Sequence, residues 1–271
     1  FLSSESISPA TQIDSTSAKP LAVRSSINLG RRADVAGSRR VYFAISPDGE
    51  RVAYTQVKED GIHLFLRELD EFVPRDLVRL SSDRFTNKPL AFSPDSQQIA
   101  YRDGSNLMRV SVRGDSPQTL TTGLTEGTMA WESDRSILYT DGIDHVLHRI
   151  AAVGGDPQRL QLEVVSYPQQ LIPHVLPGGS AVLYNEAQSG LATNGIKLAI
   201  LDTGEVRSLT ERGFAGRYVA SGHIVYMRSS AIWAVPFDLE RLEITGPEVQ
   251  VLQGVQSTPA FGLAEYSFSD E

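Results

Sequence analysis

The chain has 271 residues, of which 41% are hydrophobic and 21% charged, so it can bury a substantial core and is not a disordered tail. Its formal net charge of −8 argues against a nucleic-acid-binding protein, because affinity for phosphates comes largely from clustered lysine and arginine. The absence of cysteine from the sequence excludes disulfide frameworks, thiolate zinc sites and cysteine nucleophiles.

The amino-terminal part of the chain precedes any repeat. Residues 1–20 are rich in Ser, Thr, Ala and Pro and are predicted to be a linker to a single domain at 21–271. Leu21–Leu29 alternates apolar residues with small or polar ones, which is typical of a β-strand with one buried face. The sequence has no apolar run long enough to span a membrane and no signal-peptide pattern, so we expect any membrane helix to lie outside this chain.

From residue 43 onward a pattern recurs along the chain. Two clear copies, Phe43–Tyr54 and Leu90–Tyr101, each place a Ser-Pro-Asp turn between two apolar runs. Weaker copies follow at Met129–Tyr139, His174–Tyr184 and Tyr218–Tyr226, and a sixth begins at Glu265. The tyrosines that close the five copies lie 47, 38, 45 and 42 residues apart. Repeats of this length are typical of propeller blades or of paired-helix solenoids.

The composition of each repeat decides between these two architectures. The two apolar runs around the Ser-Pro-Asp turn predict a β-hairpin, which a helical repeat would not contain. A third apolar run follows in every copy: Ile62–Arg67, Leu107–Val112, Val146–Ile150, Ile196–Leu201 and Ala231–Val235. A fourth, more polar run ends each copy: Arg75–Leu77, Gln118–Leu120, Gln158–Leu160, Val206–Leu209 and Val249–Leu252. Four antiparallel strands per repeat predict an all-β fold, a β-propeller.

The sixth copy is incomplete, so we predict six blades of which the last is composite. Ala264–Phe268 would supply its inner strand, and Leu21–Leu29 its outer strand. Such a closure would join the two ends of the chain in one blade and protect the open sheet edges.

The Ser46-Pro47-Asp48-Gly49 turn and the Val-Ala-Tyr strand after it resemble the WD40-like, Pro-Asp containing repeat of TolB-like six-bladed propellers. The resemblance extends over about 41–271. Ile232–Asp238 and Leu242–Pro247 are similar to propellers attached to bacterial membrane-anchored kinases, adenylate cyclases and transcriptional regulators. This resemblance implies a sensor or protein-docking domain of a larger signalling protein, in the periplasm or otherwise outside the cytoplasm. It implies no shared set of catalytic residues.

The sequence offers little support for catalysis. No nucleophile-elbow, P-loop or dinucleotide-binding motif is present, and we expect no cofactor. The sequence has five histidines, His63, His145, His148, His174 and His223. His145 and His148 would lie on opposite faces of one predicted strand, and only His174 is expected near the axis. We therefore expect no metal site. The repeated tyrosines, Trp131 and Trp233 are predicted to pack between sheets, and Asp48 and Asp95 to accept hydrogen bonds from nearby backbone amides.

A binding site in a propeller is expected at the axial channel and on the loops that lead into the innermost strands. The residues predicted to line this channel mouth are Arg40, Tyr42, Asn87, Lys88, Glu126, Gln170, His174, Arg217, Tyr218 and Glu265. The cations Arg40, Lys88 and Arg217 would favour a carboxylate or an acidic peptide end. In the alternative interpretation they only keep the channel hydrated.

Three hypotheses for function follow. The first is a non-catalytic domain that binds a protein or peptide ligand and neither nucleic acid nor a membrane surface. The second is a propeller enzyme, a lyase or a hydrolase, with its site in the central channel. The third is a structural spacer. A metal ion held on the axis by several side chains would favour the enzyme.

Overall fold

A computed structural model describes residues 42–81, 89–125, 127–141, 146–162, 173–187, 193–258, 263–264 and 266–269. The predicted linker at 1–20 and the predicted outer strand Leu21–Leu29 lie outside the described residues. Every regular element within the described residues is a β-strand. Among these residues there is no helix of the length and apolar character that a membrane crossing requires.

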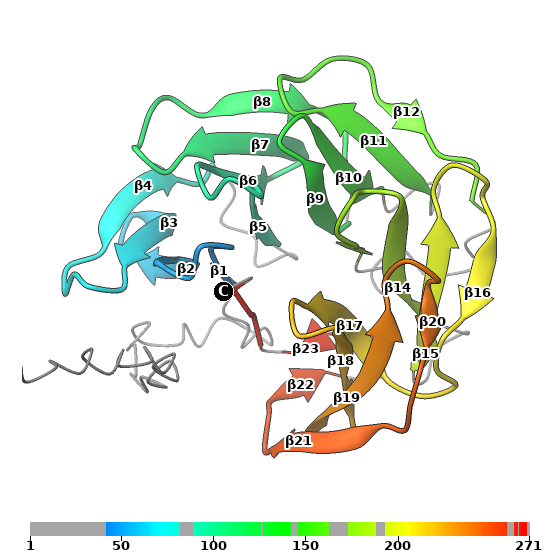
Figure 1. Ribbon diagram of the computed structural model, residues 1–271. Helices are drawn as coiled ribbons and strands as arrows, with labels where there is room; N and C mark the ends of the chain where they lie inside the picture. Colours follow the sequence, from blue (N-terminus) through cyan, green and yellow to red (C-terminus); the bar gives the residue numbers. More distant parts are fainter. Residues whose placement is uncertain are drawn as a thin grey trace, which may run out of the picture.

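Five antiparallel sheets stand around a common axis like the blades of a propeller (Figure 1). Blade 1 contains β1 (Phe43–Ile45), β2 (Arg51–Lys58), β3 (Gly61–Glu68) and β4 (Arg75–Arg79). Blade 2 contains β5 (Leu90–Phe92), β6 (Gln98–Asp103), β7 (Asn106–Ser111) and β8 (Gln118–Thr121). Blade 3 contains β9 (Met129–Ser133), β10 (Ser136–Thr140), β11 (Leu147–Ala151) and β12 (Gln158–Arg159).

The last two blades follow the same order. Blade 4 contains β13 (His174–Val175), β14 (Ala181–Ala187), β15 (Thr193–Ile200) and β16 (Val206–Ser208). Blade 5 contains β17 (Phe214–Val219), β18 (His223–Arg228), β19 (Ala231–Asp238) and β21 (Val249–Gln253). The predicted β-propeller with four antiparallel strands in each repeat is confirmed. β20 (Glu243–Ile244), which pairs with the far end of β19, was not predicted.

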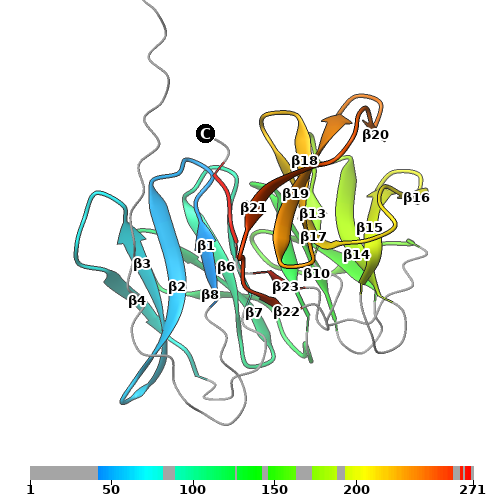
Figure 2. The same cartoon turned by 90° about the horizontal axis from the view of Figure 1, so that it is seen from below.

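The first strand of each blade lies next to the axis. These inner strands contact one another in chain order, β1 with β5, β5 with β9, β9 with β13 and β13 with β17. β22 (Ser257–Thr258) and β23 (Leu263–Ala264) form a separate two-stranded sheet, and β23 contacts β17. Beyond β23, the backbone amide of Ile45 donates to the Ser267 hydroxyl over 3.2 Å, and in both views this end of the chain lies beside β1 (Figure 2). Within the described residues, the inner wall of the ring therefore closes at the sixth position.

The core consists of apolar layers between neighbouring blades. Ile99 and Leu64 belong to the layer between blades 1 and 2, and Ile137 and Leu107 to the layer between blades 2 and 3. The five repeated tyrosines are each no more than 4% exposed, which confirms that they belong to the core: Tyr54, Tyr101, Tyr139, Tyr184 and Tyr226. Trp131 is also buried, and its indole Nε1 donates to the Ala91 carbonyl of the preceding blade over 2.9 Å. Trp131 thus ties blade 3 to blade 2, whereas Tyr54 packs against Val52 and Phe65 of its own blade.

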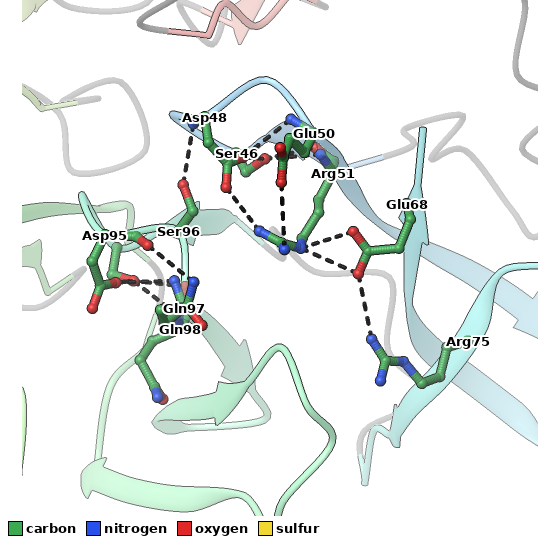
Figure 3. A network of polar contacts seen from close by, with 11 residues as sticks. Ser46, Asp48, Glu50, Arg51, Glu68, Arg75, Asp95, Ser96, Gln97 and Gln98 are labelled. Atoms are coloured by element: carbon green, nitrogen blue, oxygen red, sulfur yellow. Dashed lines mark hydrogen bonds and ion pairs between the residues drawn. The ribbon is translucent and has the colours of Figure 1, made fainter. Parts of the chain in front are cut away.

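Hydrogen bonds stabilise each Ser-Pro-Asp turn and also join neighbouring turns (Figure 3). In the first, Asp48 Oδ1 accepts from the Ser46 hydroxyl at 2.5 Å and from the Glu50 amide at 3.1 Å. Asp95 of the second copy accepts from the Gln97 amide at 2.9 Å, so the predicted bonds to local amides are confirmed. The contacts between turns were not predicted: the Asp48 amide donates to the Ser96 hydroxyl at 3.1 Å, and the Asp95 amide donates to Asp134 at 3.2 Å.

Replacing Ser96 with alanine should lower the free energy of unfolding by about 1 kcal/mol. Ser96 is 2% exposed, and its hydroxyl is the acceptor that joins the turns of blades 1 and 2. Its φ of 60° lies in the left-handed region, which Gly49 occupies in the first turn. Ser96→Gly should therefore cost less than Ser96→Ala, because glycine adopts this conformation without strain. Urea unfolding of the two variants measures both effects, and an unchanged midpoint for Ser96→Ala would exclude the proposed link.

Candidate functional site

The inner strands enclose a cavity of about 890 Å³, which is within the range of small-ligand and peptide sites. Every described blade contributes to its wall, and so does the segment that follows β23. Residues at the start of the inner strands line one part of the cavity: Tyr42, Pro89, Thr128 and Pro173. Residues of the turns after these strands line another: Pro47, Pro94, Asp134 and Gly178. The cavity therefore follows the inner strands from their beginning to their turns.

One repeated position on the inner strands gives this cavity two unlike sides. In each blade it pairs with the residue just before the repeated tyrosine, and it is occupied in turn by Ala44, Ala91, Ala130, His174 and Arg217. All five residues line the cavity. Blades 1 to 3 thus present small methyl groups, whereas blades 4 and 5 present an imidazole and a guanidinium. A ligand that enters the cavity has room on one side and polar partners on the other.

Arg217 brings a positive charge into this partly buried space. Its guanidinium lies over the ring of Tyr266, with 5.8 Å between the guanidinium carbon and the ring centre. The ion pairs found in the described part of the chain involve other arginines, among them Arg51, Arg149 and Arg228. No carboxylate of the described residues is paired with Arg217.

His174 lies beside this charge and is held neutral. Burial is the largest cause that lowers its pKa, the Arg217 charge lowers it further, and a hydrogen bond with the Tyr218 backbone opposes both effects in part. The resulting pKa is about 3, far below the ordinary value of 6.5. At neutral pH the blade 4 and blade 5 side of the cavity therefore carries one charge, that of Arg217.

A bulge in β17 sets the position of Arg217. Phe214 pairs with Met227 and Arg217 pairs with Val225, so β17 contains one more residue than β18 between these pairs. Ala215, within the bulge, has a φ of 54°. The Ala215 amide donates to Asn185 Oδ1 at 2.7 Å, and the Tyr266 hydroxyl donates to the Ala215 carbonyl. Side chains from blade 4 and from the sixth position thus fix the strained backbone just before Arg217.

This bulge corrects one detail of the sequence prediction. Arg217 and Tyr218 were expected in the loop that leads into the fifth inner strand, but they lie inside β17, which begins at Phe214. The extra residue and the early start of the strand shift both side chains from the mouth into the wall of the cavity. A bulge has no sequence signature as clear as a Ser-Pro-Asp turn, so the repeat pattern alone could not locate it.

Two acidic residues line the cavity on the side of blade 3. Glu132 stands where the first two blades have the turn serines Ser46 and Ser93. Its carboxylate accepts from Arg149 Nε at 2.7 Å and from the Ser136 hydroxyl at 2.7 Å. Asp134, also on the wall, accepts from the amide of Asp95. The cavity therefore has a cation in blade 5 and two carboxylates in blade 3, each of which accepts hydrogen bonds from neighbouring protein groups.

The structure brings together four of the ten predicted site residues. Tyr42, His174, Arg217 and Tyr218 all line the cavity. The other six lie outside the described residues: Arg40, Asn87, Lys88, Glu126, Gln170 and Glu265. The cavity residues Glu132, Asp134 and Tyr266 were not among the predicted site residues. The available signal for Glu132 was the altered turn of the third copy. In this turn Ser133 stands in place of the proline, and Glu132 stands in place of a serine that is buried in the first two copies.

The remaining histidines of the described residues lie away from this cavity. His63 contacts Asp60 and Asp76 on blade 1, His148 stacks on Tyr139 with ring centres 5.3 Å apart, and His223 contacts Ser221. His145 lies outside the described residues. No group of three His, Asp or Glu side chains in the described ranges is arranged to hold a metal ion.

The lowered pKa of His174 predicts a specific dependence of stability on pH. Between the unfolded pKa of 6.5 and the folded pKa of about 3, the unfolded chain binds a proton at this site that the folded chain does not. The contribution to stability is therefore complete above pH 6.5 and is lost as the pH falls, by about 2 kcal/mol between pH 7 and pH 5. The difference between wild type and His174→Gln in urea unfolding isolates this contribution. Parallel curves for the two proteins would show that His174 is not buried beside a cation.

No protein-family model matches the chain, and no curated protein matches its sequence. The structure is similar to TolB from Acinetobacter baumannii, with a TM-score of 0.58 and 14% identity over 81% of this chain and 56% of that chain. It is also similar to a putative TolB from Agrobacterium tumefaciens, with a TM-score of 0.54 and 17% identity over 79% of this chain and 82% of that one. A chain of the nidogen/laminin complex is similar as well, with a TM-score of 0.58 and 13% identity over 76% of this chain and 78% of that chain.

At these identities the likeness establishes the fold, which is a TolB-like β-propeller. The chain spans little more than half the length of the Acinetobacter baumannii protein. Ligands and partners are therefore a separate question, which the residues of the cavity must answer.

Proposed function

We propose that this TolB-like β-propeller is a non-catalytic recognition domain that binds a peptide, or an extended segment of a protein, in its axial cavity. The observation that carries the proposal is the cavity of about 890 Å³ between the inner strands, with alanines on one side and Arg217 on the other. Its volume, its alanines and the single cation Arg217 suit a ligand with an apolar body and one negatively charged group.

The polar groups of the cavity favour binding over catalysis. The Glu132 carboxylate accepts hydrogen bonds from Arg149 and Ser136, and the Asp134 carboxylate accepts one from the Asp95 amide. Neutral His174 bonds to the Tyr218 backbone, and the Ser267 hydroxyl accepts from the Ile45 amide. A general base would need a reacting group within hydrogen-bond reach. Among the described residues that line the cavity, no hydroxyl is hydrogen-bonded to His174.

The similar structures give independent support for recognition. A propeller of this fold occurs in the nidogen/laminin complex, where proteins are bound to one another. Together with the likeness to TolB and with the blade 5 sequence Ile232–Asp238, this supports a place in a larger bacterial signalling protein outside the cytoplasm. Protease treatment of intact spheroplasts that express the full gene tests this location. Digestion of the propeller before lysis is expected, and its protection until lysis would contradict the proposal.

Filling the cavity tests where the ligand binds. Ala130→Phe would place a phenyl ring at the cavity wall, whereas the control Val153→Phe would add the same ring at a position that is 78% exposed on the outer part of blade 3. Peptides selected on the wild-type protein from a phage-displayed random library should lose binding to Ala130→Phe by at least tenfold and retain it with Val153→Phe. Equal binding to both variants would place the site elsewhere.

A further inference from the structure

Arg217 differs from the other cavity residues because its charge has no partner of opposite sign among the described residues. The guanidinium carbon lies 5.8 Å from the centre of the Tyr266 ring, which is within the range of a cation–π contact. The backbone before it is fixed from both sides by Asn185 and Tyr266. A donor group held in this way loses little conformational freedom when an anion binds to it.

The charges around the cavity restrict the kind of anion. Glu132 and Asp134 line the same cavity as Arg217, and the whole chain has a net charge of −8. A phosphate group, with nearly two negative charges, would gain a single arginine and would lie in the same cavity as the Asp134 carboxylate. A carboxylate has one charge and two oxygens that match two parallel N–H donors of a guanidinium.

The shape of the cavity restricts what is attached to the anion. Ala44, Ala91 and Ala130, at the position equivalent to Arg217, leave space along three consecutive blades. Phe92 and Trp131 lie next to these alanines on the inner strands and also line the cavity. An apolar chain several atoms long that ends in a carboxylate would fill this space and reach the guanidinium.

We propose that Arg217 anchors the carboxylate at the end of a peptide ligand and that the apolar residues before this carboxylate lie along the alanines of blades 1 to 3. This assignment rests on the proposed recognition function and specifies its chemistry. The neutral state of His174 supports it, because a second cation beside Arg217 would favour a dianion instead.

The experiment uses two random libraries of N-acetylated tetrapeptides, identical except that one ends in a free carboxylate and the other in a carboxamide. Peptides retained by the intact chain are identified by mass spectrometry, made in both forms and measured by calorimetry. The free acid should bind at least tenfold more tightly than its amide. Arg217→Gln should abolish this difference, and Arg217→Lys should retain part of it. The control Arg228→Gln removes a blade 5 arginine that pairs with Glu248 outside the cavity, and it should leave the difference unchanged.

The outcomes separate this inference from the proposed function. If acids and amides bind equally well, peptide recognition stands and the role of Arg217 is refuted. If amidated peptides with an internal Asp or Glu bind as tightly as free acids and lose binding in Arg217→Gln, the carboxylate anchor stands but the side chain, not the chain end, supplies the carboxylate. If neither library yields a peptide that binds, the proposed function fails as well.

Discussion

Replacing Gly127 with alanine is expected to destabilise the protein by about 3 kcal/mol or to prevent its folding. A Cβ atom at this position would lie 1.8 Å from the carbonyl oxygen of Thr140 and 2.8 Å from its carbonyl carbon. Both are backbone atoms, so no side-chain rotation can relieve the overlap. The adjacent Thr128 amide donates to the Thr140 hydroxyl at 2.9 Å, and the Thr140 amide donates to the Thr128 carbonyl at 3.0 Å.

The overlap would force the beginning of β9 away from the end of β10 and break these two hydrogen bonds. Gly254→Ala is the matched control, because a Cβ at Gly254 meets no atom within 4 Å although φ is +77°. Its cost should be limited to the strain of a left-handed alanine, about 1 kcal/mol. Chemical denaturation compares the two variants. If Gly127→Ala costs no more than Gly254→Ala, the close approach of these strands is wrong.

Removing the partner of Glu132 should have an effect of similar size. The Glu132 side chain is 8% exposed, and its charge is compensated by an ion pair with Arg149. Arg149 Nε donates to both carboxylate oxygens of Glu132. Arg149→Ala would leave a nearly buried carboxylate with the Ser136 hydroxyl as its remaining donor, a loss that typically costs about 3 kcal/mol.

The sequence of the other blades supplies the compensating change. Serine occupies the equivalent of Glu132 in blades 1 and 2, where no arginine is needed beside it. The double variant Glu132→Ser with Arg149→Ala should therefore recover most of the stability that Arg149→Ala loses. A double-mutant cycle measured by urea unfolding tests this. Additive losses would show that the two residues act independently.

The blades were predictable because three signals coincide in the two clear repeats, a turn motif, apolar runs of strand length and a closing tyrosine, and the last two recur in the weaker copies. Even the copies without the turn proline kept the tyrosine, and Tyr139 and Tyr226 are as buried as Tyr54. The inner strand of the sixth blade was predicted at Ala264–Phe268, but the strand there is β23 (Leu263–Ala264), and 266–269 is not a strand. Its partner β22 was not predicted, because it is two residues long and carries no alternation of apolar and polar residues.

The candidate site was predictable only in part. The innermost strand of each blade lines the central channel in any propeller, so His174 could be placed near the axis from its position in the repeat. The environment of Arg217 could not be predicted, since it depends on a bulge, on a left-handed Ala215 and on a tyrosine that follows β23. These features bring together residues from three blades, and no local pattern in the sequence encodes such contacts.

The ligand site is assigned to the axial cavity, with Arg217 as the anchor. A crystal structure of the chain grown with the tightest free-acid tetrapeptide tests both parts of this assignment. We expect peptide density between the inner strands, with the terminal carboxylate on the Arg217 guanidinium and the apolar side chains near Ala91 and Ala130. Peptide density on an outer strand such as β21 or on the rim of the blades, with an empty cavity, would contradict it.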